Sequence, residues 1–164
     1  MTPKLRALLI VVGTVLPLDY LTKLWIVRNV MPTDPIRVIP GFFSITHARN
    51  PGAALGLLQD VHVFFFIALT VVALGLILSF YRKADPQDRL SATALGLVLA
   101  GALGNLIDRV VRHEVVDFLQ FDLGLFIFPD FNVADSAIVI GVGLLLLDIV
   151  ALETEEAVNE EAEP

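Results

Sequence analysis

Cysteine is absent from this sequence of 164 residues. The chain therefore cannot form a disulfide, bind a metal through thiolates or use a cysteine nucleophile. A His-Glu-x-x-His pattern is also missing, and the three histidines do not have the spacing of a metal-ligand set. No nucleophile-elbow motif surrounds any serine, so a serine hydrolase built on Ser136 with His47 or His113 has little support. A metal site is not expected.

Charged residues are missing from two long apolar stretches, residues 61–81 and 90–107. Two further apolar runs cover residues 5–27 and 132–152. Because a helix rises about 1.5 Å per residue, runs of about 20 residues can cross the hydrocarbon core of a bilayer. Hydrophobic residues make up 56% of the chain, more than a soluble domain of this size could bury. The sequence predicts a mainly α membrane protein, with four transmembrane helices in one domain over residues 1–152.

The two ends of the chain carry different signals. The formal net charge is −7, and six glutamates in residues 153–164 account for all but one unit of it. We expect this segment to be a disordered acidic tail, and the charge gives no support to nucleic-acid binding. At the other end, the first apolar run continues past Pro17 and no small-residue cleavage site follows it. A span is therefore favoured over a cleavable signal peptide.

Two segments between the apolar runs are rich in turn-forming, β-branched and aromatic residues. In the first, Ile36–Thr46 surrounds a Pro-Gly turn and predicts a short strand or hairpin. A glycine-rich segment follows, with a possible short helix that ends at Gln59; its alternative is an ordinary external loop. In the second, residues 115–121 and 125–128 flank Asp122-Leu123-Gly124 and predict another hairpin.

The third apolar run combines a packing signal with polar residues at its end. Small residues recur at every fourth position and would let a neighbouring helix approach closely. They are Gly96, Ala100 and Gly104. Asn105, Asp108 and Arg109 then share one helix face. They could anchor a helix terminus at the membrane interface or belong to a site.

Polar residues in or beside the spans gather on one side of the expected topology. Four spans place both termini on one side of the membrane and both long loops on the other. The residues that converge on the loop side are Asp19, Lys23, Asn50, Asn105, Asp108, Arg109, Asp117, Asn132 and Asp135. Ionisable groups near the bilayer are costly and indicate function by default. Asp19 and Lys23, four residues apart, either neutralise each other or support this site.

The positive charges favour one orientation. Five lysines and arginines lie on the terminal side and five on the loop side, besides Lys23 in the first span. Those on the terminal side are packed into short segments beside spans, which favours termini in the cytoplasm. The site would then lie near the outer face of the membrane.

Asp117 and Asp135 are the strongest catalytic candidates. Two adjacent carboxylates that share one proton can activate a water molecule and protonate a leaving group, as peptide hydrolysis requires. Each acid also has a purely structural interpretation. Asp117 could be a strand residue that faces water, and Asn132 with Asp135 could cap the fourth helix. The pattern alone leaves these alternatives open.

Five sequence boxes resemble the lipoprotein signal peptidase family (signal peptidase II), over about residues 19–136. The boxes are Asp19-Tyr20-Leu21-Thr22-Lys23, Arg49-Asn50-Pro51-Gly52-Ala53-Ala54, Gly101-Ala102-Leu103-Gly104-Asn105-Leu106-Ile107-Asp108-Arg109, Val116-Asp117-Phe118 and Phe131-Asn132-Val133-Ala134-Asp135. The chain departs from the family at Ala100, commonly glycine there, and at Leu55-Gly56, where Phe-Ser is frequent. Neither position carries an acid.

The resemblance implies an aspartyl endopeptidase of the bacterial inner membrane, with Asp117 and Asp135 as the catalytic dyad. Substrate-binding or supporting roles are implied for Asn50, Gly52, Asn105, Asp108, Arg109, Asn132, Ala134, Asp19 and Lys23. The implied substrate is a prolipoprotein whose cysteine carries diacylglycerol, cut just before that cysteine. The resemblance also implies a small extracytoplasmic β-platform, a short periplasmic helix and inhibition by globomycin-type peptides, and no cofactor. We further expect contact with membrane lipids and a monomer.

Two other functions are less favoured. A proton- or ion-coupled carrier would need a polar path across the membrane, and the middles of the second and third apolar runs are uncharged. A non-catalytic scaffold would leave the converging acids unexplained. Presenilin-like aspartyl proteases share the chemistry, but their Tyr-Asp and Gly-x-Gly-Asp motifs are absent.

Overall fold

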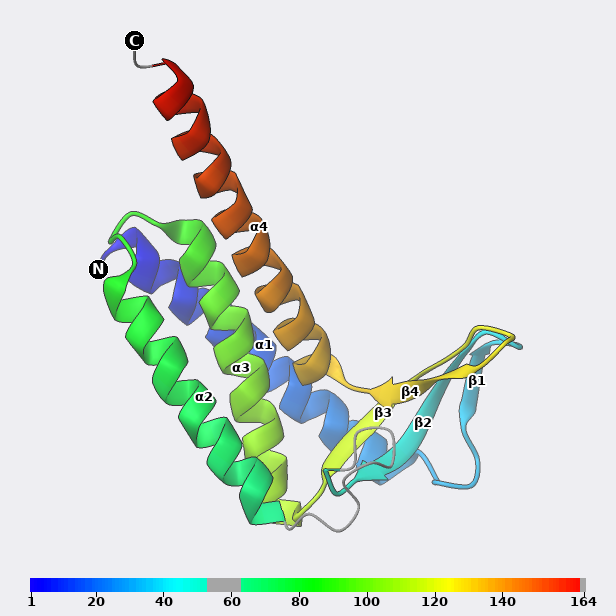
Figure 1. Cartoon of the computed structure of the whole chain (residues 1–164). Helices are drawn as coiled ribbons and strands as arrows, with labels where there is room; N and C mark the ends of the chain where they lie inside the picture. Colours follow the sequence, from blue (N-terminus) through cyan, green and yellow to red (C-terminus); the bar gives the residue numbers. More distant parts are fainter. Residues whose placement is uncertain (53–62, 163–164) are drawn as a thin grey trace.

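The computed structural model describes residues 1–52 and 63–162, which form long helices and one small sheet (Figure 1). The helices are α1 (Pro3–Asn29), α2 (Val63–Lys83), α3 (Arg89–Arg112) and α4 (Val133–Ala162). The strands are β1 (Ile36–Ile39), β2 (Phe43–Asn50), β3 (Val115–Asp122) and β4 (Ile127–Phe131). The mainly helical fold class with a small sheet is confirmed.

Three helical segments of the described chain are long and apolar enough to cross a membrane: Pro3–Asn29, Phe64–Lys83 and Arg89–Arg112. Large apolar side chains of α2 are more than half exposed. They include Phe64, Leu69, Val72, Leu76 and Phe80. An exposed apolar surface of this size is unfavourable in water and is typical of a membrane-spanning helix. The chain is therefore a multi-pass membrane protein, and the fourth span stays a prediction.

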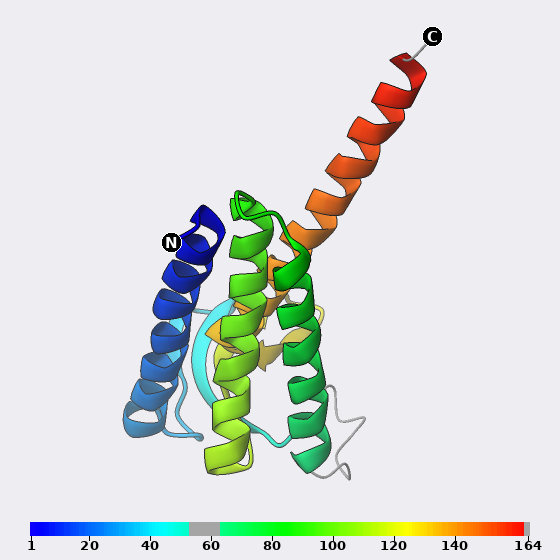
Figure 2. The ribbon, with the colours of Figure 1, turned by 90° about the vertical axis from the view of Figure 1, so that its left-hand side faces the viewer.

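Helix α3 is the centre of the helical layer. It packs against α1, α2 and α4, and Figure 2 shows it between α1 and α2. The small residues expected to allow close approach lie at these contacts. A Cβ atom at Gly96 would lie 3.2 Å from the Val11 side chain of α1, and one at Gly104 would meet Asp19. Ala100, between them, is fully buried.

The sheet is antiparallel, in the order β1-β2-β3-β4, and lies beyond the end of α1 (Figure 1). The two predicted hairpins are confirmed, with Gly41 and Gly124 at positive φ in their turns. The β2–β3 pairing joins them, and it places Ala48 opposite Asp117. Val116 and Phe118, on the other side of β3 from Asp117, pack on the C-terminal part of α1. The sheet is thereby held at one end of the helices.

Two helix ends differ from the sequence analysis. Helix α3 was expected to end at residue 107 and instead continues to Arg112, where His113 closes it in the left-handed conformation. The Asp108–Arg112 ion pair, four residues apart, supports this last turn. Helix α4 continues through Ala162, so the segment expected to be disordered is helical there; its alanines and glutamates are good helix formers. The short helix expected up to Gln59 lies outside the described residues.

Candidate active site

The start of α4 is held by side chains from two elements. The Asp135 N–H donates to Asn132 Oδ1 (2.9 Å), and the Asn132 N–H donates back to Asp135 Oδ2 (3.1 Å). This is the reciprocal arrangement of a capping box. The Ala134 N–H donates to Asp19 Oδ1 at 2.9 Å, so α1 supplies a further cap. The predicted cap on α4 is confirmed, and it joins α1 to α4.

Asp135 uses its second oxygen to contact α3. Its Oδ1 accepts a hydrogen bond from Asn105 Nδ2 at 2.7 Å. The orientation of the Asn105 amide is set by its other side, because Asn105 Oδ1 accepts from Lys23 Nζ at 2.9 Å. An ammonium group can only donate, so the amide oxygen must face Lys23 and the amide nitrogen must face Asp135. Both oxygens of Asp135 are thus held.

Asp117 approaches the same place from strand β3. It is 3% exposed, so the alternative of a water-facing strand residue is wrong. Its Oδ1 accepts from Asn132 Nδ2 at 2.7 Å and its Oδ2 accepts from Asn50 Nδ2 at 3.0 Å. Asn132 therefore caps Asp135 through its oxygen and binds Asp117 through its nitrogen. One asparagine joins the two acids.

The loop after β2 fixes Asn50. Its Oδ1 accepts the Gly52 N–H at 2.9 Å, which leaves Nδ2 to face Asp117. Gly52 has φ +117°, and a Cβ atom there would overlap the ring of Phe66 on α2. Only glycine adopts this conformation and contact without strain. The guanidinium of Arg109 lies 5.4 Å from the centre of the same ring.

Arg109 is a cation beside the two acids. It interacts electrostatically with both Asp135 and Asp117. Its Nη1 makes only a long hydrogen bond, 3.4 Å, to the Asn105 carbonyl. Its Nε is buried and has no hydrogen-bond partner among the described residues. The side chain thus retains donors for another group.

The environment of Asp117 raises its pKa to about 6. Burial is the largest cause, because it disfavours the charged carboxylate. The hydrogen bond from Asn50 opposes it, and the negative charge of Asp135 adds to it. Weaker opposing effects come from Asn132 and Lys23. A proton can therefore be held on Asp117 up to about pH 6, next to a second carboxyl group.

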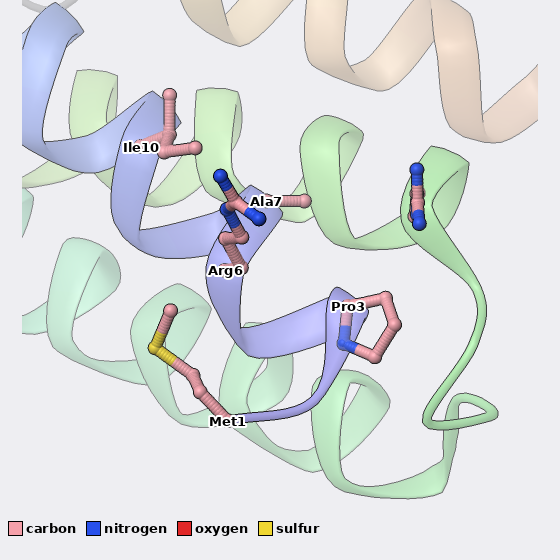
Figure 3. Close-up of a pocket in the computed structure, with 6 residues that line it drawn as sticks. Met1, Pro3, Arg6, Ala7 and Ile10 are labelled. Carbon is pink, nitrogen blue, oxygen red and sulfur yellow. The ribbon is translucent and has the colours of Figure 1, made fainter.

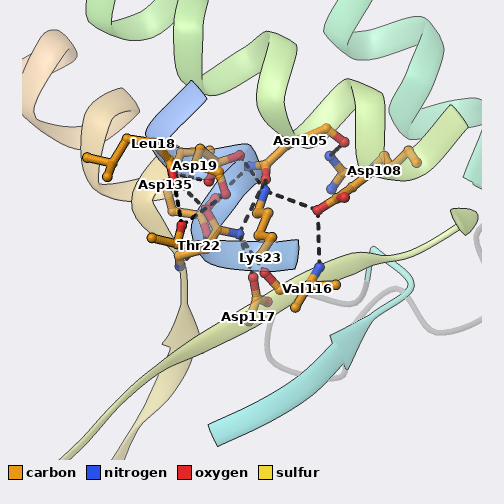
Figure 4. A network of polar contacts seen from close by, with 12 residues as sticks. Leu18, Asp19, Thr22, Lys23, Asn105, Asp108, Val116, Asp117 and Asp135 are labelled. Atoms are coloured by element: carbon orange, nitrogen blue, oxygen red, sulfur yellow. Dashed lines mark hydrogen bonds and ion pairs between the residues drawn. The ribbon is translucent and has the colours of Figure 1, made fainter. Parts of the chain in front are cut away.

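Lys23 is the centre of a second layer of polar contacts (Figure 4). It is 1% exposed, and its Nζ lies 2.9 Å from Asp19 Oδ2 and 3.1 Å from Asp108 Oδ2. Asp108 Oδ1 lies 3.1 Å from Arg112 Nε. Two cations and two carboxylates alternate in this layer, so their charges balance. The Asp19–Lys23 pair therefore neutralises itself and also orients Asn105.

The structure brings every predicted site residue to this region. It also adds Arg112 and Phe66, which the sequence analysis did not select. The spacing of four residues from Asp108 could have identified Arg112. Phe66 could not have been selected from the sequence, since it lies among other apolar residues of α2.

The rival serine site is not assembled. Ser136 Oγ donates to the Asn132 carbonyl (2.9 Å), and His47 Nδ1 lies 2.8 Å from the Val30 carbonyl. Both groups are thus engaged with backbone oxygens. Within residues 1–52 and 63–162, no group of three or more histidine, aspartate and glutamate side chains has an arrangement suited to a metal ion.

Comparisons with known proteins agree on one family. The family model for signal peptidase II matches residues 11–151. The lipoprotein signal peptidase of Geobacter sulfurreducens is 46% identical over 159 residues, which cover 96% of this chain and 99% of that protein. The lipoprotein signal peptidase of Bacillus pumilus is 48% identical over 132 residues, which cover 80% and 84%.

Two solved structures share the fold. Both are bacterial membrane enzyme structures obtained by the in meso method, at 2.3 and 1.9 Å resolution, and each is 38% identical to this chain. The first has a TM-score of 0.80 and covers 88% of this chain and 87% of its own. The second has a TM-score of 0.78 and covers 87% and 91%.

Proposed function

The chain belongs to the signal peptidase II family, and from that premise we propose that it removes the signal peptide from prolipoproteins as an aspartyl endopeptidase. The supporting observation is the position of Asn132, which caps Asp135 and hydrogen-bonds Asp117. Two carboxyl groups from different elements thus share one bridging residue.

In the proposed mechanism, Asp117 and Asp135 hold one proton between them. The ionised carboxylate accepts a proton from water while the oxygen of that water bonds to the scissile carbonyl carbon. The protonated carboxyl donates to the carbonyl oxygen. The carbon–nitrogen bond then breaks, and the leaving amine takes up one proton from the dyad. A hydroxyl group of the diol intermediate returns its proton to the dyad as the new carboxyl group forms, so the dyad again holds one proton. Neither role is assigned to a particular one of the two acids.

The supporting residues limit how the acids move. Asn50, Asn105 and Asn132 hold three of the four dyad oxygens by amide donors, and a backbone N–H holds the fourth. Fixed donors stabilise carboxylate charge without reorganisation during the reaction. Arg109 has a free buried donor beside both acids, and we assign it to substrate binding.

The proposed substrate is a prolipoprotein whose cysteine already carries diacylglycerol, cut just before that cysteine. A lipid-bearing signal helix would reach the dyad laterally, from the bilayer. We further propose four spans in the bacterial inner membrane, cytoplasmic termini, a dyad near the outer face, a monomeric enzyme and inhibition by globomycin-type peptides. Outward-facing apolar side chains on α2 support contact with membrane lipids.

The test is cleavage of a synthetic diacylglyceryl prolipoprotein peptide by the full chain in detergent. Asp117→Asn and Asp135→Asn should each lower kcat/KM by about 10³-fold or more, since general acid–base catalysis contributes about 10²–10⁴. The matched control is Asp122→Asn on the same strand, where Asp122 Oδ1 accepts the Gly124 N–H in a turn. Asparagine can keep that bond, so its activity should stay within twofold of wild type.

Folding is checked in each variant by circular dichroism and thermal unfolding. A folded Asn variant of either dyad acid that keeps wild-type turnover would refute the dyad. Cleavage of the same peptide without diacylglycerol tests whether the enzyme requires the lipid, independently of the role of the dyad. Equal rates on the two peptides would refute the proposed role of the lipid and leave the dyad standing.

A further inference from the structure

A cavity of about 480 Å³ lies at the opposite end of the helices from the candidate active site. Figure 3 shows the residues that line it. It is formed where α1 and α3 begin, whereas the site lies toward the ends of these helices. Its lining residues are Met1, Pro3, Arg6, Ala7, Ile10 and Arg89. Nothing in the proposed peptidase mechanism uses this cavity.

The side chains of the lining carry two positive charges and no acid. Arg6 and Arg89 are both exposed, and neither guanidinium has an ion pair or hydrogen bond within the described part of the chain. The acid next to Arg89 is already engaged, because Asp88 Oδ1 accepts the Ser91 N–H at 2.9 Å to cap α3. The two guanidinium groups are therefore available to an anion.

Lys4, on the same helix, differs from the two arginines because its ammonium group has hydrogen-bond partners within the protein. It is 8% exposed, and its Nζ donates to the carbonyl oxygens of Tyr81 (2.8 Å) and Ala84 at the end of α2. That lysine is used to close α2 and is unavailable to a ligand. Arg6, two residues later, has no such structural role.

The rest of the cavity is apolar. Ile10 lies four residues after Arg6, about 6 Å further along α1 at about 1.5 Å per residue. Ala7 and Pro3 complete this apolar surface. Since α1 and α3 are both long and apolar enough to span the membrane, their first turns lie where headgroups meet the hydrocarbon core. The cavity thus presents cations at headgroup level and apolar side chains beside them.

We propose that this cavity binds an anionic phospholipid from the leaflet on the side of the chain termini. The lipid phosphate would lie between Arg6 and Arg89, because guanidinium groups match the geometry of phosphate oxygens. The first part of an acyl chain would cover Ile10 and Ala7. Basic pockets between transmembrane helices are known to hold anionic headgroups in this way. A soluble anion would satisfy the arginines but leave the apolar surface uncovered.

The experiment is native mass spectrometry of the purified full chain in a zwitterionic detergent, with added phosphatidylglycerol or phosphatidylcholine. The double variant Arg6→Gln/Arg89→Gln should weaken phosphatidylglycerol binding about tenfold or more. The matched control is Arg82→Gln/Lys83→Gln, which removes the same charge from exposed residues in the last turn of α2 that do not line the cavity. The control should bind within twofold of wild type.

Three outcomes would overturn the proposal. Equal losses in the two double variants would mean that overall charge, and not this cavity, attracts the lipid. Binding of phosphatidylcholine as tight as that of phosphatidylglycerol would mean that the site does not select anions. Competition by inorganic phosphate as effective as that by phosphatidylglycerol would identify a soluble-anion site. Thermal unfolding of both variants confirms that they are folded, and none of these results depends on peptidase activity.

Discussion

Asn132 shows how one side chain serves both the fold and the candidate chemistry. Its oxygen accepts the Asp135 N–H, as helix capping requires, and its nitrogen donates to Asp117 at 2.7 Å. The same nitrogen makes longer hydrogen bonds, 3.3 Å each, to Asn105 Oδ1 and the Val116 carbonyl. Cap and catalytic acid are therefore not competing interpretations of residues 132–135. The geometry of the cap brings the second carboxyl group to the right place, and the rigidity of a helix start limits its motion.

Asp117 determines the pH dependence that we expect for activity. Its pKa is raised to about 6, mainly by burial. If the dyad works with one shared proton, loss of that proton at higher pH removes the general acid. We expect kcat/KM on the lipidated peptide to fall about tenfold per pH unit above about pH 6. Activity that stays flat up to pH 8, in one detergent and at constant ionic strength, would contradict this.

The same group makes folding stability depend on pH. The pKa of Asp117 is higher in the folded protein than the ordinary value of 3.8. Protonated Asp117 therefore favours the folded state, fully so below about pH 4, and this contribution is lost as pH rises through about 6. Tm should fall across this window in the wild type and fall less in Asp117→Asn. An equal or larger fall in the variant would assign the effect to other groups.

The acids and amides of the site could be predicted from the sequence because each is costly near a membrane and stands out from its surroundings. The hydrogen bonds and ion pairs between these side chains could not be predicted from the sequence. Whether Lys23 pairs only with Asp19 or also contacts Asp108 and Asn105 depends on how α1 packs against α3. Phe66 lies among other apolar residues of α2, so no contrast in polarity distinguishes the one ring that supports Arg109.

Among the contacts between elements, the close packing of α3 against α4 positions the residues of the site. A Cβ atom at Gly101 would overlap the Ala134 carbonyl and the Ile138 side chain, so glycine is required for this contact. The Ala134 N–H is the donor that Asp19 caps. Separation of the two helices would therefore disturb both the cap and the position of Asp135.

Two glycine-to-alanine variants test this contact. Gly101→Ala should destabilise the protein by about 1–3 kcal/mol, the usual cost of overpacking, and should lower activity. The matched control is Gly143→Ala in α4, where a new Cβ atom meets nothing within 4 Å. Alanine favours a helix by about 1 kcal/mol over glycine, so the control should be neutral or stabilising. Thermal unfolding in detergent measures both, and equal stabilities would show that α3 and α4 do not need the close approach.

The sequence predicts which segments form helices and which form strands more accurately than it predicts the residues at which these elements end. Both hairpins could be predicted because turn residues separate β-branched and aromatic runs. The end of α3 could not, since hydropathy falls at residue 107 while backbone hydrogen bonding continues to Arg112. Hydropathy indicates where a helix leaves the hydrocarbon core, and local propensity and side-chain pairing decide where it stops. The same distinction accounts for the continuation of α4 through Ala162.

Across the whole molecule, polar side chains at the two ends of the helices have different partners. At the site end, the charges of Lys23, Asp19 and Asp108 are buried and paired, and the partly buried Arg112 pairs with Asp108. At the terminal end, Lys4 is engaged, whereas Arg6 and Arg89 are exposed and line the cavity. Paired charges suit a fixed site, and exposed arginines suit the surface of a membrane whose cytoplasmic leaflet is anionic. This asymmetry supports an orientation with the termini inside.

The absence of cysteine makes this orientation directly measurable, because any introduced thiol is unique. Thr33→Cys, in the exposed turn between α1 and β1, and Gln87→Cys, in the exposed turn between α2 and α3, lie at opposite ends of the spans. In intact spheroplasts, a membrane-impermeant maleimide should label the cysteine at position 33 and leave that at 87 unlabelled. Permeabilised cells should label both, which controls for reactivity.

A third variant, Thr154→Cys, counts the spans. If α4 crosses the membrane, as we propose, position 154 lies on the same side as position 87, and both should become labelled only after permeabilisation. Labelling of position 154 in intact cells would mean that α4 does not return to the terminal side, so the chain would have three spans. Labelling of position 87 but not position 33 would instead invert the orientation. The proposed dyad would then face the cytoplasm, on the wrong side of the membrane for the lipoprotein-processing function.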